Sequence, residues 1–317
     1  MRYIGFDVGG TKCAVTVATV ENGQVIFEGK RAFPTPEPWQ EAVERMFQAA
    51  EELLGDKRAD ACGFSCGSPL DAEKGIVLAP PNLPGWDHVP VTRLAQERFG
   101  VPAFLENDAN ACALAEWRWG AGRGVDNMIF LTFGTGMGAG LILGGRLIRG
   151  ANGNAGEAGH MRLADFGPAG YGKEGSFEGF CSGGGLKQLG VTLGKRAVQS
   201  GVHPAYFMGD WEAVSAKSIA QAAQHGDETA REVYRLCGEK LGQALSVLVD
   251  LLNPERIVIG SIYARSGELL EEEMQRVMCR ECLPQSLAVA KVVPAELGET
   301  LGDCAALCVA EYGLTQR

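Results

Sequence analysis

Alternating and β-branched apolar segments open the chain. Residues 3–8, 13–20 and 24–30 each carry the hydrophobic pattern of a strand. Gly9-Gly10 separates the first two segments, and Asn22-Gly23, a strong signal for a two-residue hairpin, separates the second from the third. The chain is therefore predicted to begin as a β-meander with two tight turns.

Apolar residues spaced three and four apart dominate several later segments, and this spacing is typical of the buried stripe of a helix. Helices are predicted over residues 39–54, 91–99, 108–119, 228–252 and 304–312, the last with Asp303 as its N-cap. Short buried strands are predicted over residues 59–65, 102–106, 256–260 and 288–293. This mixture of elements indicates an α/β protein.

The opening pattern recurs in the middle of the chain. Strand-like residues 129–133 lead into the glycine turn 134–136, and a second strand, 139–143, leads through Gly144-Gly145 into residues 146–148. A shift of about 125 positions superimposes the two patterns, which predicts a duplicated fold. We expect a small domain over residues 1–110 plus the C-terminal helix 303–317, a large domain over 111–302, and a cleft between them.

Composition and charge exclude several classes of partner. The chain of 317 residues carries a net charge of −10 and no basic run, which disfavours nucleic acid and anionic membranes. Neither a secretory signal nor an apolar run of membrane-spanning length is visible, so a cytoplasmic location is expected. The 10 cysteines lie mostly in apolar segments and are expected to be reduced core residues. The spacing of Cys279 and Cys282 leaves a redox or metal role open.

The turn after the first strand has the composition of a phosphate-binding loop. Gly9 and Gly10 expose backbone N–H groups, Thr11 adds a hydroxyl and Lys12 a positive charge. Asp7, directly before the turn, is placed to hold Mg²⁺ through water, because Mg²⁺ keeps much of its hydration shell. The alternative is a tight Gly-Gly hairpin without a ligand.

The corresponding turn of the repeat is also rich in glycine. We expect Gly134, Thr135, Gly136 and Gly138 to form a second phosphate loop. The same glycines match a dinucleotide-binding fingerprint, but that motif opens a helix, whereas this one runs into a predicted strand. A side chain at Gly136 is expected to block a phosphate while leaving a sugar site intact.

Four polar residues, Glu106, Asn107, Asp108 and Asn110, stand between the two loops, where a predicted strand ends and a helix begins. A carboxylate at such a junction can accept a proton from a substrate hydroxyl. Helix capping would account for one of these residues but not for all four.

These motifs, in this order, resemble those of the ROK family (repressor, open reading frame, kinase) over essentially the whole chain. Asp7–Lys12 and Gly134–Gly140 resemble its two phosphate motifs, and Glu106–Asp108 its catalytic segment. Pro81–Trp86 is similar to its sugar loop, and Gly156–His160 to its sugar-contacting Glu-x-Gly-His.

The resemblance implies a duplicated actin/hexokinase-like (ribonuclease-H-like) fold and ATP-dependent, magnesium-assisted phosphorylation of a hexose, usually at the 6-hydroxyl. It implies that Asp108 is the general base and that the protein is a homodimer. The residues implied to bind the sugar are Asn82, Asn107, Asp108, Glu157, His160 and Glu178. The identity of the sugar stays open.

The chain departs from the family pattern at a zinc site. The family usually places three zinc-binding cysteines after the histidine, and here those positions hold Ala169, Tyr171 and Ser176. Thiolates are the strong ligands of such sites, so no zinc is expected.

Two other functions are open. A sugar-responsive repressor of the same family would carry a DNA-binding segment before the first phosphate motif, and only six residues precede Asp7 in this sequence. A non-catalytic sugar-binding sensor would not need both phosphate loops and Asp108.

Overall fold

The computed structural model describes residues 1–316, which form two compact units. The first comprises Met1–Val125, Gly140–Ala155 and the chain from Glu296 onward, and the second comprises Asp126–Ala139 and Gly156–Ala295. This division differs from the predicted boundary at residue 110, because that position lies inside one continuous helix, α3 (Asp108–Trp119).

A sheet of five strands in the order β3-β2-β1-β4-β7 forms the centre of the first unit. Its strands are β1 (Arg2–Val8), β2 (Lys12–Glu21), β3 (Gln24–Pro34), β4 (Ala61–Cys66) and β7 (Ala103–Asn107). β1, β2 and β3 are antiparallel, whereas β4 and β7 continue the sheet in parallel. Asn22 and Gly23 both have positive φ, as a two-residue hairpin requires, which confirms the predicted turn.

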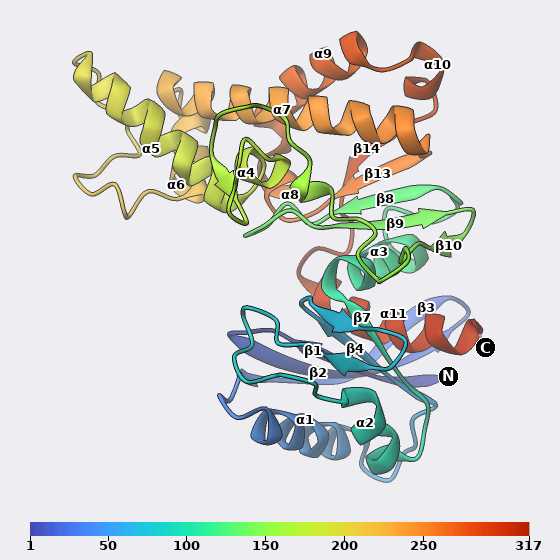
Figure 1. The fold of residues 1–317 in the computed structure, drawn as a ribbon. Coiled ribbons are helices and arrows are strands. Elements are labelled where there is room, and N and C mark those ends of the chain that lie inside the picture. Colours follow the sequence, from blue (N-terminus) through green and yellow to red (C-terminus); the bar gives the residue numbers. More distant parts are fainter. Residues whose placement is uncertain (317) are drawn as a thin grey trace. The chain divides into compact units, whose positions relative to one another are not determined.

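Helices cover both faces of this sheet (Figure 1). α1 (Trp39–Leu54) and α2 (Val91–Phe99) lie on one face, and α11 (Leu301–Thr315) packs on β1 and β4 from the other, with α3 against it. The sheet face under α11 is smooth because it carries glycine: a Cβ at Gly63 would lie 2.1 Å from the carbonyl oxygen of Ala306. The short strands β5 (Leu70–Asp71) and β6 (Ile76–Val77) form a separate hairpin.

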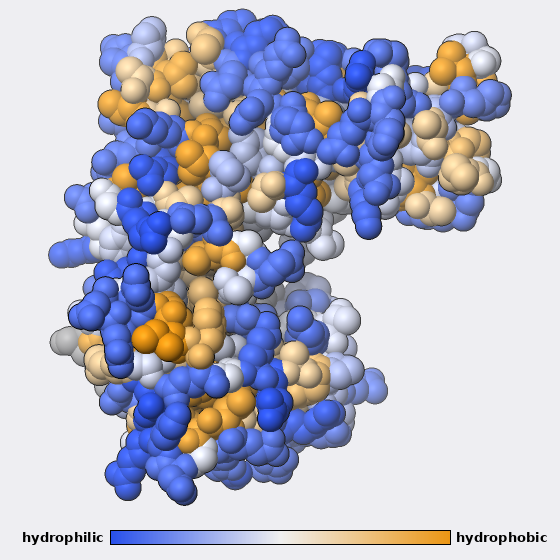
Figure 2. Space-filling model, turned by 180° about the vertical axis from the view of Figure 1, so that it is seen from behind, coloured by the Kyte–Doolittle hydropathy of each residue, from blue (hydrophilic) through white to orange (hydrophobic). Residues whose placement is uncertain are grey.

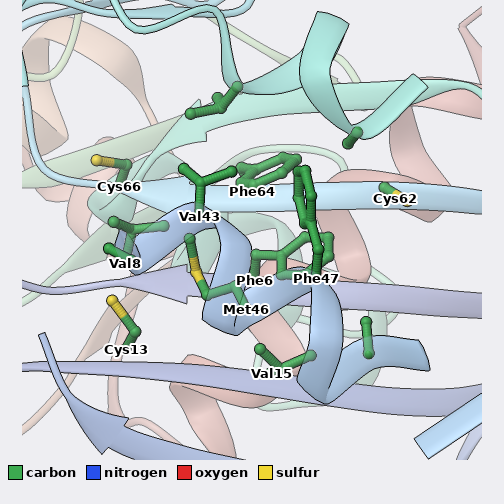
Figure 3. Packing of buried hydrophobic residues seen from close by; sticks show 14 of the residues in the cluster. Phe6, Val8, Cys13, Val15, Val43, Met46, Phe47, Cys62, Phe64 and Cys66 are labelled. Atoms are coloured by element: carbon green, nitrogen blue, oxygen red, sulfur yellow. The ribbon is translucent and has the colours of Figure 1, made fainter. Parts of the chain in front are cut away.

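The core between this sheet and α1 is aromatic and aliphatic. Figure 3 shows Phe6 and Phe64 side by side on neighbouring strands, with Phe47 of α1 over them. The rings of Phe6 and Phe64 stack with centroids 4.5 Å apart, and Phe47 meets Phe6 edge-on at 5.7 Å. This core fixes the carboxyl ends of β1 and β7, where two of the predicted motifs begin.

The second sheet repeats the order of the first, as β10-β9-β8-β13-β14. Its strands are β8 (Met128–Leu131), β9 (Ala139–Leu143), β10 (Arg146–Leu147), β13 (Arg256–Ile259) and β14 (Lys291–Pro294). β13 is parallel to both β8 and β14, and β10 is antiparallel to β9. In each sheet the first three strands lie in the order third, second, first, and two strands from later in the chain follow beside the first. This shared order confirms the predicted duplication.

Helices α5, α6, α7 and α9 pack together in the second unit, where α7 lies over the sheet (Figure 1). The helices are α4 (Phe177–Phe180), α5 (Gly183–Gln199), α6 (Ala216–Gln224), α7 (Glu228–Leu252), α8 (Ile262–Ser266), α9 (Glu271–Glu281) and α10 (Pro284–Leu287). The small hairpin of β11 (Ala169–Gly170) and β12 (Lys173–Glu174) follows a one-turn 3-10 helix at Ala158–His160.

One capping prediction is wrong. α11 begins at Leu301, three residues earlier than expected, so Asp303 lies in its first turn and is not the N-cap. The Asp303 carboxylate instead accepts hydrogen bonds from Thr16 (3.0 Å) and from the Lys30 ammonium (2.6 Å). Side chains of β2 and β3, which the local pattern around Asp303 does not reveal, therefore determine its role.

The surface and the cysteines agree with the composition. On the face shown in Figure 2, hydrophilic residues predominate and hydrophobic ones lie in separate small groups. No helix within residues 1–316 is long and apolar enough to cross a membrane. All the cysteines are free thiols, and most are buried, including Cys282, whereas Cys279 is exposed.

Candidate active site

The first glycine loop connects β1 to β2, and hydrogen bonds to its backbone close it. Gly9 N–H donates to the carbonyl of Lys12 (3.1 Å), and the Thr35 hydroxyl donates to the Gly9 carbonyl (2.5 Å). A Cβ at Gly10 would lie 2.1 Å from the carbonyl oxygen of Asn82, so no other residue fits there without a shift. Thr11 and Lys12 are exposed, as a phosphate-binding loop requires.

Asn82 is presented by a loop that two apolar residues anchor. Leu83 and Trp86 are almost fully buried. The N–H of Leu83 donates to the carbonyl of Pro80, and the N–H of Trp86 donates to the carbonyl of Leu83, so each residue closes a turn. Asn82 itself is exposed and contacts the first glycine loop. The predicted sugar loop and the predicted phosphate loop are therefore neighbours within the first unit.

The predicted catalytic segment, Glu106–Asp108, lies where β7 ends and α3 begins. Asn107 is the N-cap, because its side-chain oxygen accepts from Asn110 N–H (2.8 Å). One oxygen of Asp108 accepts from the N–H of Ala109 (2.8 Å). Asp108 reaches solvent, yet the surrounding protein desolvates its carboxyl and raises its pKa. Asn107 thus performs the capping, and Asp108 is available for proton transfer.

Asp7, at the end of β1, has an environment that disfavours negative charge. Burial, assisted by the carboxylates of Asp303 and Asp108 and opposed by the charges of Lys12 and Lys30, raises the pKa of Asp7 to about 6. Asp7 and Asp108 therefore lie in one electrostatic environment, which fits the placement of both beside a phosphate loop.

Arg149 is a component of this region that the sequence reasoning missed. Its guanidinium Nε donates to Oε2 of Glu106 (2.7 Å), whose side chain is only 3% exposed. Oε1 of the same carboxylate accepts from Asn110 Nδ2 (3.0 Å) and from the N–H of Asn107 (3.2 Å). Glu106 thus joins Arg149 to Asn107 and Asn110 on either side of Asp108. No local signal marks Arg149, because its partner lies 43 residues away in the sequence.

The second glycine loop connects β8 to β9, so it does not open a helix and the dinucleotide fingerprint is excluded. Met137 N–H donates to a carboxylate oxygen of Glu178 (2.9 Å). A Cβ at Gly136 would lie 2.8 Å from the same oxygen. A side chain at Gly136 would therefore move the Glu178 carboxylate, and its expected effect on phosphate and sugar binding stays a prediction.

The segment carrying Glu157 and His160 is attached to the second glycine loop by two close backbone approaches. A Cβ at Gly156 would lie 2.2 Å from the carbonyl oxygen of Ala139, and one at Gly159 would lie 2.2 Å from that of Met137. Only glycine permits these approaches without a shift. Glu157 and His160 are both exposed, so they are free to contact a ligand.

A cavity of about 770 Å³ adjoins the second glycine loop within the second unit. Its lining includes Gly134, Thr135, Gly183, Gly184, Lys187 and Arg265. Ser182 caps α5 through the N–H of Gly185 (3.0 Å), so the amino end of a 17-residue helix faces the cavity. Helix amino ends and basic side chains both attract anions. The sequence signal, a serine followed by three glycines, was present but went unused.

The positions of the family's zinc cysteines have other contacts. Ser176 is fully buried, and its hydroxyl accepts from Gly179 N–H (3.0 Å) as the cap of α4. Tyr171 is 75% exposed, and Cys181, the nearest thiol in sequence, faces Cys237 with its sulfur 3.8 Å away. Within residues 1–316 no group of three or more histidine, cysteine, aspartate or glutamate side chains is arranged to hold a metal ion.

Two sheets of the same strand order, each with a glycine loop after its first strand, define an actin/hexokinase-like fold. The chain belongs to the ROK family, whose profile matches residues 3–311.

Relatives of known description include both kinases and repressors. The glucokinase of Thermotoga maritima is 31% identical over 303 residues, which is 95% of each chain. The putative xylose repressor of a Caldicellulosiruptor species is 33% identical, over 97% of this chain and 77% of its own. The crystal structure of a ROK family glucokinase from Streptomyces griseus, in complex with glucose and AMPPNP, is 30% identical with a TM-score of 0.78. The match covers 99% of this chain and all of that one.

Proposed function

We propose that this protein is an ATP-dependent hexose kinase that phosphorylates the 6-hydroxyl, with Asp108 as general base. The observation that carries the proposal is the environment of Asp108. Its carboxyl has a raised pKa at a strand–helix junction beside Asp7 and the first glycine loop. A base whose pKa lies closer to the working pH transfers protons more effectively. The Asp108 carboxylate would take the proton of the attacking hydroxyl.

The nucleotide is assigned to the cavity beside the second glycine loop. Its volume is within the range of small-molecule sites, and Lys187, Arg265 and the amino end of α5 supply positive charge. The glucokinase of Streptomyces griseus, which shares the fold, was crystallised with AMPPNP, an ATP analogue. We assign the predicted sugar contacts to Asn82, Asn107, Asp108, Glu157, His160 and Glu178.

Asp7 fits a water-mediated contact to Mg²⁺. Burial and two neighbouring carboxylates raise the pKa of its carboxyl, and a nearby cation would favour the charged form. When bound, Mg²⁺ would neutralise phosphate charge during the transfer. We propose a contact through water because, among residues 1–316, Asp7 does not belong to a group of three or more side chains arranged to hold a metal ion.

We propose that the protein carries no structural zinc. Ala169 has no ligating side chain, the Ser176 hydroxyl is engaged in the cap of α4, and Cys181 faces Cys237. These donors do not fit a tetrahedral site around His160. Elemental analysis of protein purified without chelator tests this, and about one zinc per chain, with activity lost on its removal, would refute it.

The test of the main proposal is a coupled ADP-release assay with a panel of hexoses, including glucose, N-acetylmannosamine, N-acetylglucosamine, fructose and allose. We expect sugar-dependent turnover of ATP and a phosphate on the 6-hydroxyl, located by NMR of the product. Turnover that is independent of every sugar would contradict the proposal. Size-exclusion chromatography tests the expected homodimer.

A second candidate is a sugar-responsive regulator that binds a sugar without catalysis. The relative described as a putative xylose repressor favours it. Sugar binding by calorimetry, combined with no ATP turnover for any sugar of the panel, would support the regulator over the kinase.

A further inference from the structure

The hairpin of β11 and β12 is held to α5 by one side chain. Gln188 accepts a hydrogen bond from the N–H of Ala169 and donates one to the Ala169 carbonyl, both at 2.9 Å. This paired contact fixes the start of the hairpin. Its tip, Tyr171-Gly172, is therefore held in a defined place relative to α5.

Tyr171 is an unfavourable residue for the tip. Ala169 pairs with Glu174 and Gly170 with Lys173, so the turn has two residues, and both have positive φ (47° and 74°). Such a turn favours Asn-Gly, which is the sequence of another two-residue hairpin of this chain, Asn22-Gly23. A bulky side chain in the left-handed region is costly. Because Tyr171 is 75% exposed, burial does not compensate for this cost.

Tyr171 and Lys173 both contact His160. The Tyr171 ring stands perpendicular to the imidazole, with centroids 5.6 Å apart. The Lys173 ammonium donates to the His160 carbonyl at 2.5 Å. Among the described residues, nothing hydrogen-bonds to the imidazole nitrogens, so the Tyr171 ring is the contact that orients them. The nitrogens remain free for a ligand.

We propose that Tyr171 is a positioning residue that orients the His160 imidazole toward a sugar hydroxyl. The proposal rests on the proposed function, because it takes His160 as a sugar contact. This role accounts for a tyrosine that has positive φ and is exposed. The hairpin places its ring edge-on against the His160 imidazole and so restricts the orientation of the imidazole. The ring acts through His160 and does not itself touch the reacting atoms.

The test compares Tyr171→Asn, which supplies the preferred turn residue without the ring, with Tyr171→Phe, which keeps the ring. The sugar is the best substrate of the wild-type protein in the hexose panel. We expect Tyr171→Asn to raise KM for the sugar about two- to tenfold, the value of one aromatic edge contact. KM for ATP and kcat should stay unchanged, and Tm should be equal or higher. Tyr171→Phe should behave as wild type.

A double-mutant cycle with His160→Asn separates positioning from a general effect on the loop. If Tyr171 acts through His160, adding Tyr171→Asn to His160→Asn should change KM no further. A wild-type KM for Tyr171→Asn, or additive effects in the double variant, would overturn the inference.

Failure of the proposed kinase function can be distinguished from failure of the Tyr171 inference. In the first case, the wild-type protein turns over no ATP with any sugar. Titration of glucose into the same variants by calorimetry then measures the effect of Tyr171. A wild-type protein that binds none of the sugars would overturn both proposals.

Discussion

Replacing Asp7 by Asn should stabilise the protein near neutral pH, although Asp7 lies in the candidate site. Burial, assisted by Asp303 and Asp108, raises the pKa of Asp7 to about 6 from an unfolded-state value of 3.8. Between these values the folded state binds more protons than the unfolded state. The free energy of unfolding therefore falls as pH rises through this window and is constant above it.

The size of the effect follows from the shift in pKa. At 1.36 kcal/mol per pKa unit, ionised Asp7 lowers the free energy of unfolding by about 2–3 kcal/mol above the window. Asn has the shape of protonated Asp and cannot ionise. The difference between Asp7→Asn and wild type should thus be near zero at about pH 4 and reach its full value at about pH 7.

Urea unfolding of metal-free and nucleotide-free protein at several pH values between about 4.5 and 7.5 measures this difference. The slope of the free energy against urea should be equal for the two proteins, so that the midpoints report stability. A pH-independent difference, or an Asn variant less stable than wild type at neutral pH, would refute the reasoning. Kinase activity of the stabilised variant should nevertheless fall, because Asp7 is assigned to Mg²⁺.

Three further substitutions test other parts of the site. Asp108→Asn should lower kcat by about 10²–10⁴ while sugar binding by calorimetry changes little, and near-wild-type turnover would assign the base elsewhere. Arg149→Met should cost about 1.5–3 kcal/mol in urea unfolding, because it leaves the buried Glu106 carboxylate without its charged partner. The same change in a Glu106→Gln background should cost less, and equal costs would show that the pair is not coupled. Gly184→Val should raise KM for ATP but not for the sugar. A Cβ at Gly184 would lie 3.8 Å from Ser182 Oγ, an ordinary contact, and the valine side chain would fill part of the cavity. An unchanged KM for ATP would place the nucleotide elsewhere.

Elements whose pattern is local and repeated could be predicted from the amino-acid sequence. The bounds of α1, α2, α3 and α7 agree with the prediction residue by residue. α1, α2 and α7 each have a regular apolar stripe, whereas α3 is buried on most sides. The Asn22-Gly23 turn and the two glycine loops were likewise readable, since the required φ values and close approaches limit the choice of residue. The duplication followed from the recurrence of these signals.

Contacts between side chains that lie far apart in the sequence could not be predicted, because they depend on tertiary packing. The partners of Glu106 and Ala169, namely Arg149 and Gln188, lie 43 and 19 residues away. The cavity joins loops that begin near Gly134, Gly183 and Ser261. Such contacts depend on how strands and helices pack, and no periodicity along the chain encodes them. The sequence could therefore indicate which residues carry the chemistry, whereas packing across the sheet and its helices decides which neighbours position them.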